Sequence, residues 1–309
     1  MRPTVFIHTN HKQYLGALAS MHSFRRFSHN ADKFDVEIIH SKDYPFLQRH
    51  EGEPFLRDGG TREWHYDDLQ SFTPLRFLPP QLMGYEGRAV VVDPDVFAVA
   101  DIWDLLTRDM AAKAVLTRRR GGARSITGGG SWNSSVMLLD CAKLGHWKPE
   151  EQFEELFQMK RDYRSWVTLD DEDQAAIGEL EPAWNDFDHL GPLTKMVHNT
   201  RRMTQPWKSG LPVDFVPAER FKFFPPVAWA MKARRKLFGD YGLLGNYRNH
   251  PDRRQQDLFF GLLKECLETG LVSEAQLREE MRQNHVRHDA FDVIAATPPL
   301  AESPQRLAA

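Results

Sequence analysis

The residues best suited to chemistry in this chain are two aspartates separated by a proline, Asp93-Pro94-Asp95. They directly follow the apolar run Val90-Val91-Val92, which predicts a short buried strand. Side chains two positions apart in an extended chain point the same way, so we expect both carboxylates to face one spot. Hard oxygen ligands of this kind suit Mg²⁺ or Mn²⁺. For the tripeptide alone, the alternative is an ordinary Asp-Pro turn with both acids in solvent.

Other polar clusters adjoin short apolar runs that are also predicted as strands. The run at 4–7 leads into the cluster His8-Thr9-Asn10-His11, Asn133 precedes the run at 136–139, and the run at 195–197 ends at His198. In a mostly parallel sheet these clusters could meet at one edge, where open α/β sheets bind ligands. Two aspartates with an imidazole favour Mn²⁺ over Mg²⁺. Arginines beside such a site indicate a diphosphate.

The order of the predicted elements indicates an α/β fold. Strand, polar loop and helix (residues 12–27) open the chain, as in a βαβ unit, but without a Gly-x-Gly-x-x-Gly fingerprint. We therefore expect a mostly parallel Rossmann-type sheet flanked by helices over residues 1–223. After Pro225-Pro226 the pattern becomes helical, which predicts a helical C-terminal extension at 224–309 with a disordered tail.

Composition excludes several classes of protein. The chain has 309 residues, a net charge of −3, 41% apolar residues and two cysteines. No basic field of the kind that binds nucleic acid is indicated, and two thiols in apolar segments favour a reducing compartment over a disulfide scaffold. Without a signal-peptide pattern or an apolar run of about 20 residues, we expect a cytoplasmic protein.

One segment leaves membrane contact open. Aromatic residues at 221–224 and Trp229 adjoin a basic run at 232–236. Such a segment could lie at the inner face of an anionic membrane, next to a lipid-linked acceptor. The alternative is a helix packed on the rest of the protein with its basic residues in solvent.

Six motifs follow in order between about residues 4 and 208. They are Arg76 upstream of Pro80, Asp93-Pro94-Asp95 with the helix-like segment 101–105 behind it, Asn133 to Asp140, Asp173-Gln174, Pro182-Ala183-Trp184-Asn185, and His198 followed by Pro206-Trp207. In this order they resemble the retaining family 8 glycosyltransferases, which have the GT-A nucleotide-diphospho-sugar transferase fold.

The resemblance implies a metal-dependent enzyme that moves a hexose from a UDP-sugar to an acceptor hydroxyl with retention. The acceptor would be a saccharide or a lipid-linked molecule of bacterial surface polysaccharide or lipopolysaccharide synthesis. The implied roles are Mn²⁺ or Mg²⁺ binding by Asp93, Asp95 and His198, nucleoside contacts from Thr9, Asn10 and Tyr14, phosphate contacts from Arg76, a sugar or acceptor contact from Asn133, and a catalytic place beside the anomeric carbon for Asp173 and Gln174.

Three of these residues also have a structural interpretation. Tyr14 lies on the apolar stripe of its predicted helix, and His198 follows an apolar strand. Asp173 lies in an acidic stretch, residues 170–177, that predicts the first turn of a helix, where acids favour the helix dipole.

The chain departs from the family pattern in two places. The segment from His198 to Trp207 is one residue longer, with Arg201 at the glycine position and Gln205 at the lysine position. Arg201, Arg202 or Lys208 would then supply the charge on phosphate. Ser135 stands where the family has glycine.

Two other functions stay open. A non-catalytic nucleotide-sugar or carbohydrate-binding protein would account for the altered histidine motif. A sugar nucleotidyltransferase would keep the fold, but it requires a Gly-rich basic loop after the first strand, and residues 8–11 contain no glycine.

Overall fold

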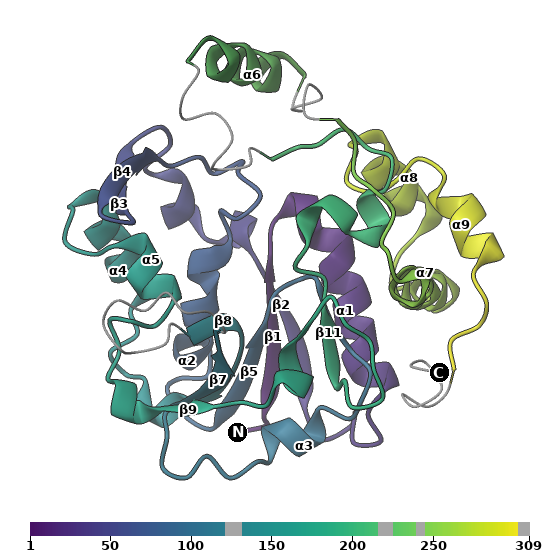
Figure 1. Ribbon diagram of the computed structural model, residues 1–309. Coiled ribbons are helices and arrows are strands. Elements are labelled where there is room, and N and C mark those ends of the chain that lie inside the picture. Colours follow the sequence, from purple (N-terminus) through teal and green to yellow (C-terminus); the bar gives the residue numbers. More distant parts are fainter. Residues whose placement is uncertain (121–131, 216–224, 239–244, 302–309) are drawn as a thin grey trace. The chain divides into compact units, whose positions relative to one another are not determined.

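The computed structural model describes residues 1–120, 132–215, 225–238 and 245–301 (Figure 1). Contacts between Cα atoms divide the chain into two compact units, residues 1–198 with Ala301, and residues 199–300.

A six-stranded sheet forms the centre of the first unit, in the order β2-β1-β5-β8-β7-β9 (Figure 1). The strands are β1 (Thr4–Thr9), β2 (Asp35–His40), β5 (Arg88–Val92), β7 (Val115–Arg119), β8 (Trp132–Asp140) and β9 (Ile177–Glu179). β1 pairs in parallel with β2 and β5, and β7 pairs in parallel with β9. β8 is antiparallel to both β5 and β7, so it alone runs against the other strands of this sheet.

Two smaller sheets complete the described strands. β6 (Val96–Ala98) pairs antiparallel with β11 (Met196–His198), which pairs in parallel with β10 (Asp186–Phe187). β3 (Pro54–Arg57) and β4 (Gly60–Glu63) form an antiparallel hairpin with Gly59 in the left-handed region, at φ 70°.

Short helices connect these strands. The α-helices of the first unit are α1 (Tyr14–Arg26), α2 (Pro79–Leu82), α3 (Trp103–Leu106), α4 (Pro149–Phe157) and α5 (Tyr163–Val167). The 3₁₀ helices are η1 (His11–Gln13), η2 (Ser41–Asp43), η3 (Pro45–Gln48), η4 (Thr73–Phe77), η5 (Cys141–Lys143), η6 (Gln174–Ala176) and η7 (Pro182–Asn185). α1 packs on β1, β2 and β6.

Apolar side chains bury the central sheet on both faces. In β5, Ala89 and Val91 belong to one apolar cluster, and Val90 and Val92 belong to the other. β1 and β8 divide their side chains between the same two clusters. A strand covered on both faces needs no polar alternation, which explains why the sequence at 89–92 is a continuous apolar run.

The second unit is helical in its described parts. It contains η8 (Arg202–Thr204), η9 (Pro206–Lys208), α6 (Pro225–Phe238), α7 (Arg253–Glu268), α8 (Glu274–Arg282) and α9 (Ala290–Ala296). Trp207 packs on Phe259 of α7, with ring centroids 4.7 Å apart. The Ser273 hydroxyl accepts a hydrogen bond from the Gln276 amide and caps α8, as its position predicts.

These observations confirm the prediction of an α/β fold with a mostly parallel sheet and a helical C-terminal part. The predicted boundary at residues 223 and 224 and the predicted disordered tail after Ala301 lie outside the described residues, as does the aromatic segment 221–224. The prediction of a helix at 170–177 is wrong. Residues 174–176 form η6 and β9 begins at Ile177, because the chain there pairs with β7 instead of continuing the turn.

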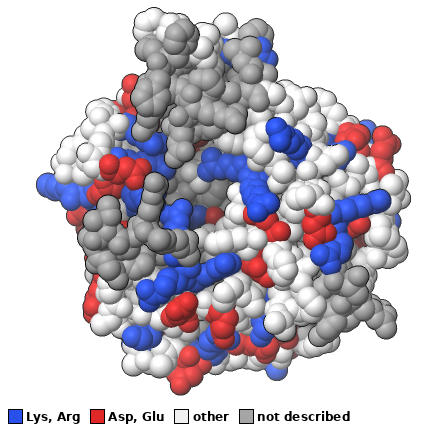
Figure 2. Space-filling view, in the orientation of Figure 1, with Lys and Arg blue, Asp and Glu red and all other residues white. Residues whose placement is uncertain are grey.

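Within the described ranges, no helix combines the length and the hydropathy that a membrane span requires. On the face seen in Figure 2, Lys and Arg side chains lie among Asp and Glu side chains, and neither sign of charge covers the whole face.

Candidate active site

A tight turn between β5 and β6 carries the two aspartates. The Val96 amide donates a hydrogen bond to the Asp93 carbonyl oxygen at 3.2 Å, with Pro94 in the second position of the turn. Proline is favoured there because its φ is already near the value that the turn requires. The carboxylates therefore converge through a turn, not through the extended strand that the spacing suggested.

Helix α1 approaches this turn closely at Gly16. A Cβ atom built on Gly16 would lie 2.8 Å from the Pro94 carbonyl oxygen, closer than real Cβ atoms come to a neighbour. Glycine therefore allows α1 to pack directly behind the turn. The Ser20 hydroxyl of the same helix donates to the Val96 carbonyl oxygen at 2.6 Å, which fixes the far end of the turn.

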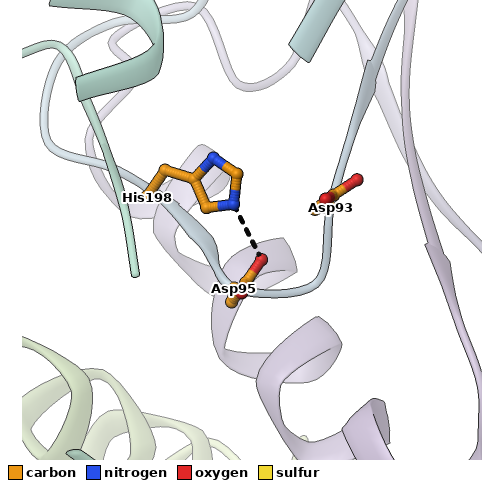
Figure 3. A group of neighbouring side chains, drawn as sticks. All are labelled: Asp93, Asp95 and His198. Carbon is orange, nitrogen blue, oxygen red and sulfur yellow. Dashed lines mark ion pairs between the residues drawn. The ribbon is translucent and has the colours of Figure 1, made fainter. Parts of the chain in front are cut away.

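Asp93, Asp95 and His198 come together as a potential metal-binding group (Figure 3). Each offers a ligand atom, and these atoms all lie within 4.8 Å of one another. His198 reaches the group because β11 pairs with β6, where it lies opposite Val96. Its Nε2 is 3.3 Å from Asp95 Oδ1. In the part of the chain that the structure describes, no other such cluster of His, Cys, Asp or Glu occurs.

Arg76 and His8 hold the Asp93 carboxylate. Arg76 Nε donates to Oδ1 at 2.9 Å and Nη2 donates to Oδ2 at 2.5 Å, while His8 Nε2 lies 2.9 Å from Oδ1. Burial by itself would raise the pKa of Asp93, but Arg76 and then His8 hold that pKa well below its usual range. Arg76 Nη1 donates to Ser134 Oγ at 2.9 Å, so β8 also orients the guanidinium.

His198 is oriented by buried amide and hydroxyl groups. Its Nδ1 lies 2.8 Å from Asn185 Oδ1, and the Asn185 amide donates to Ser135 Oγ at 3.0 Å. Ser135 Oγ in turn donates to Asn133 Oδ1 at 2.5 Å. Because an amide oxygen can only accept, Nδ1 carries a hydrogen, and in the neutral ring Nε2 is then left with a lone pair. Burial lowers the pKa of His198, but Asp95 and Asp93 together outweigh it, so the net direction is upward.

The donor set fits a divalent metal. Two carboxylates and one imidazole nitrogen can serve as metal ligands. The second imidazole nitrogen is hydrogen-bonded, as it almost always is in metal-binding histidines. Arg76 and His8 both contact Asp93 Oδ1, whereas Oδ2 has the single contact with Arg76 and keeps a lone pair for a metal. Mn²⁺ suits this mixed oxygen and nitrogen set better than Mg²⁺.

The residues predicted to meet the nucleoside lie at the end of β1. This end adjoins the Asp93 turn, because Ile7 of β1 pairs with Val92 of β5. Thr9 and Asn10 are buried, and the Asn10 side chain caps η1 by accepting from the Lys12 amide at 3.1 Å. Tyr14 is half-buried at the start of α1, with its ring centroid 5.4 Å from that of His40. Their contacts with a nucleoside stay predictions.

Asp173 and Gln174 have structural contacts in this chain. The exposed Asp173 carboxylate accepts from the Ala175 amide at 2.9 Å and caps η6. Gln174 Oε1 accepts from Trp132 Nε1 at 2.8 Å, and its Nε2 donates to the Leu169 carbonyl oxygen at 2.8 Å. Their places beside the anomeric carbon stay predictions, as does the sugar contact of Asn133.

Two of the cations proposed for phosphate, Arg201 and Lys208, belong to the second unit, and the predicted phosphate contact of Arg76 in the first unit also stays a prediction. Arg201 is exposed, just before η8. Lys208 is buried, and its Nζ donates to Asp214 Oδ2 at 2.8 Å and to the Asn284 carbonyl oxygen at 3.0 Å. The predicted phosphate contacts of Arg201 and Lys208 stay predictions.

Sequence reasoning gave no role in the site to His8 and Asn185. Both are fully buried, and each contacts one of the three metal-site side chains. His8 could have been found from the parallel register of β1 with β5, which places it beside Asp93. Asn185 was in the Pro-Ala-Trp-Asn motif, but nothing in the sequence pairs it with His198.

No family model and no curated protein matches this chain. Several solved structures do match, each over about two thirds of it. The glycosyltransferase GlyE of Streptococcus pneumoniae TIGR4 aligns at 16% identity over 66% of this chain and 55% of its own, with a TM-score of 0.46. The galactosyltransferase LgtC, solved with donor and acceptor sugar analogues, aligns at 13% identity over 66% and 89%, with a TM-score of 0.47.

Mouse xyloside xylosyltransferase 1 aligns at 13% identity over 64% of this chain and 97% of its own, with a TM-score of 0.41. All three matched proteins are glycosyltransferases, the class of enzyme that the sequence motifs resemble. At TM-scores below 0.5, however, these likenesses assign no activity to this chain.

Proposed function

We propose that this protein is a metal-dependent glycosyltransferase that moves a hexose from a UDP-sugar to an acceptor hydroxyl with retention. The observation that carries the proposal is the convergence of Asp93, Asp95 and His198 at the end of β5, within 4.8 Å of one another. The order of the six sequence motifs supports a nucleotide-sugar donor. The acceptor is a saccharide or a lipid-linked saccharide of a bacterial surface polymer.

Mn²⁺ is the proposed metal, held by Asp93, Asp95 and His198, and when bound it would neutralise charge on the departing diphosphate. The surrounding residues preorganise this site. Arg76 keeps Asp93 ionised and in place, and Asn185 keeps the Nε2 lone pair of His198 directed at the two carboxylates. Side chains already fixed before the donor binds do not have to be ordered during the reaction.

The proposed reaction is attack by the acceptor on the same sugar face that the diphosphate leaves. A double displacement requires a carboxylate nucleophile beside the anomeric carbon. Asp173 is the carboxylate that the motifs offer as a nucleophile, but it is exposed and caps a 3₁₀ helix. This supports direct same-face attack over a double displacement. Proton NMR of the first-formed product tests the stereochemistry, and an inverted anomer would rule this mechanism out.

We also propose that the protein works in the cytoplasm. Cys141 and Cys266 are both buried and neither forms a disulfide, and burial raises the pKa of each thiol to about 12. Thiols of this kind fit a reducing compartment.

Binding without turnover is the second candidate, and one observation favours it. The family pattern has a lysine before Pro206-Trp207, whereas this chain has Gln205, and Lys208 is held inside the second unit by Asp214 and Asn284. A protein without that cation on phosphate could bind UDP-sugars without cleaving them.

Release of UDP from a panel of UDP-sugars, measured with Mn²⁺ and again with a chelator, separates the two candidates. The enzyme should release UDP from one donor only when the metal is present. A binding protein should show a thermal shift with UDP-sugars and no release.

The Asp95→Asn variant should abolish metal-dependent UDP release, because a neutral amide is a much weaker metal ligand than a carboxylate. Asp104→Asn is the matched control, since the Asp104 side chain is 65% exposed and lies 3.7 Å from Lys195. Release that is unaffected by Asp95→Asn or by the chelator would contradict the proposed site.

A further inference from the structure

Helix α6 (Pro225–Phe238) exposes large apolar side chains. Trp229 is 69% exposed and Leu237 is 75% exposed. They are eight residues apart, so they lie on one side of the helix, two turns from each other. Exposed side chains of this size on one helix face mark an interaction surface.

The positions of α6 whose side chains the structure describes as exposed form one apolar stripe. They are Pro226, Trp229, Ala230, Ala233 and Leu237. At roughly 100° per residue, these five positions fall within an arc of about 100°. No polar residue interrupts the arc, whereas the outward face of an ordinary surface helix is polar.

Basic residues flank the stripe. α6 contains Lys232, Arg234, Arg235 and Lys236 and no acidic residue. Positions 232 and 236 border the arc on one side, and position 234 borders it on the other. The helix therefore combines an apolar face with cationic borders, and its charge is complementary to an anionic surface.

We propose that α6 is an interfacial helix that binds this protein to an anionic lipid bilayer. Trp229 and Leu237 enter the boundary between headgroups and acyl chains, and the positive charge of the helix attracts the lipid phosphates. A tryptophan is well suited to this depth because its ring is apolar and its N–H is polar. A protein partner would have to combine an apolar groove with acidic rims, whereas anionic bilayers have both features throughout. The inference does not depend on the proposed activity.

Co-sedimentation of the full chain with vesicles tests the proposal. We expect binding to vesicles of phosphatidylcholine with 30% phosphatidylglycerol, weakening as salt is raised, and little binding to phosphatidylcholine alone. The double variant Trp229→Ala/Leu237→Ala should bind about tenfold more weakly or worse. Replacing Lys232 and Lys236, the two lysines beside the stripe, by Gln should weaken binding roughly thirtyfold.

Variants on other surfaces test whether vesicle binding depends on the apolar stripe of α6 or on any exposed apolar or basic residue. Leu193→Ala removes a leucine that is 84% exposed outside α6, and Arg253→Gln removes an exposed arginine of α7. Both variants should bind vesicles as the unmodified chain does. A chelator should not change vesicle binding, so a failure of the metal site and a failure of this surface are distinguishable.

Quenching by brominated phosphatidylcholine, mixed into the anionic vesicles, locates the contact. The chain should lose part of its tryptophan fluorescence, and Trp229→Phe should bind equally well without that loss. Equal binding to neutral and anionic vesicles, unchanged binding of the double variant, or quenching that persists in Trp229→Phe would overturn the proposal. So would an absence of vesicle binding together with a dimer that the double variant dissociates, because the stripe would then be covered by a second copy.

Discussion

At the scale of single residues, the site depends on side chains behind the metal-binding group as much as on the group itself. Arg76 and His8 hold Asp93, and Asn185 holds His198. These groups fix the charge of one candidate ligand and the tautomer of another. Groups of this kind contribute to metal affinity without touching the metal.

Asn185→Leu should weaken Mn²⁺ binding by about 10- to 100-fold. The leucine removes the acceptor for the His198 Nδ1 hydrogen, so the ring no longer keeps its Nε2 lone pair toward Asp95. Titration with Mn²⁺, followed by the electron paramagnetic resonance of the free ion, measures the affinity. Asn185→Asp keeps an acceptor oxygen in place and should retain most of the affinity for Mn²⁺. An equal loss in both variants would show that Asn185 acts only through packing.

At the scale of elements, the close contact between α1 and the Asp93 turn depends on Gly16. Gly16→Ala would bring a Cβ to 2.8 Å from the Pro94 carbonyl oxygen, which is a backbone atom and cannot rotate away. Alanine favours a helix by about 1 kcal/mol, but crowding in a packed interior costs roughly 1–3 kcal/mol. We therefore expect a net loss of stability and weaker Mn²⁺ binding.

Urea unfolding and the Mn²⁺ titration measure the two effects of Gly16→Ala. Gly145→Ala is the matched control, because nothing lies within 4 Å of a Cβ built there. If Gly16→Ala were as stable as the unmodified chain and bound Mn²⁺ equally well, the contact would have no bearing on the site.

His50 links the segment before β3 to α4 and makes the stability of the protein dependent on pH. It lies between Glu53 and Glu154, at 2.8 and 2.7 Å, and stacks on Phe157, while Arg49 contacts Glu154 at 3.7 Å. Burial opposes the charge of His50, but the two glutamates outweigh it and raise its pKa above the ordinary value of 6.5.

Because the folded-state pKa of His50 is raised, its contribution to stability is fully present below about pH 6.5 and is lost as pH rises through the folded value. Glu154→Gln should therefore lower the free energy of unfolding at pH 6 by about 1 to 2 kcal/mol, and by less at pH 8.5. Urea unfolding followed by circular dichroism measures both values. If Glu154→Gln lowered the free energy of unfolding equally at pH 6 and pH 8.5, His50 would not be the source of the pH dependence.

At the scale of the whole molecule, the chain divides into two units, and each has its own packed interior. The first is built on the sheet with its two apolar clusters, and the second contains α7 and the buried Trp207. The second unit also contains a buried polar group in which Asp214 contacts both Lys208 and the Tyr247 hydroxyl. Two separate interiors suggest two units that unfold separately.

Lys208→Met should destabilise the second unit by about 3 kcal/mol, since breaking a buried ion pair leaves its partner charge poorly compensated. Hydrogen exchange followed by mass spectrometry should show faster exchange in α7 and little change in β1 and β5. Lys264→Met, at a partly buried lysine of α7, is the control and should change exchange much less. Equal acceleration in both units would show that the chain unfolds as one.

The sequence by itself determined the class of fold and indicated the three side chains of the potential metal-binding group. Continuous apolar runs such as 89–92 predicted buried strands, and those strands form the sheet. Polar residues at strand ends could meet at one edge of a sheet, and the family resemblance implied Asp93, Asp95 and His198 as ligands; these three side chains lie together. Local patterns carry this information because burial and strand geometry impose it on every strand separately.

The tertiary structure alone decided how these side chains are held. Pairing of β11 with β6 brings His198 beside Asp95, and packing of η4 and β1 against the turn brings Arg76 and His8 to Asp93. These partners are 17 to 103 positions apart in the chain, and no local periodicity encodes such pairs. The exposure of Trp229 and Leu237 also could not be predicted from the sequence, because an apolar helix face has the same sequence pattern whether it is buried or exposed. Contacts between distant segments depend on register and packing, which only the folded chain defines.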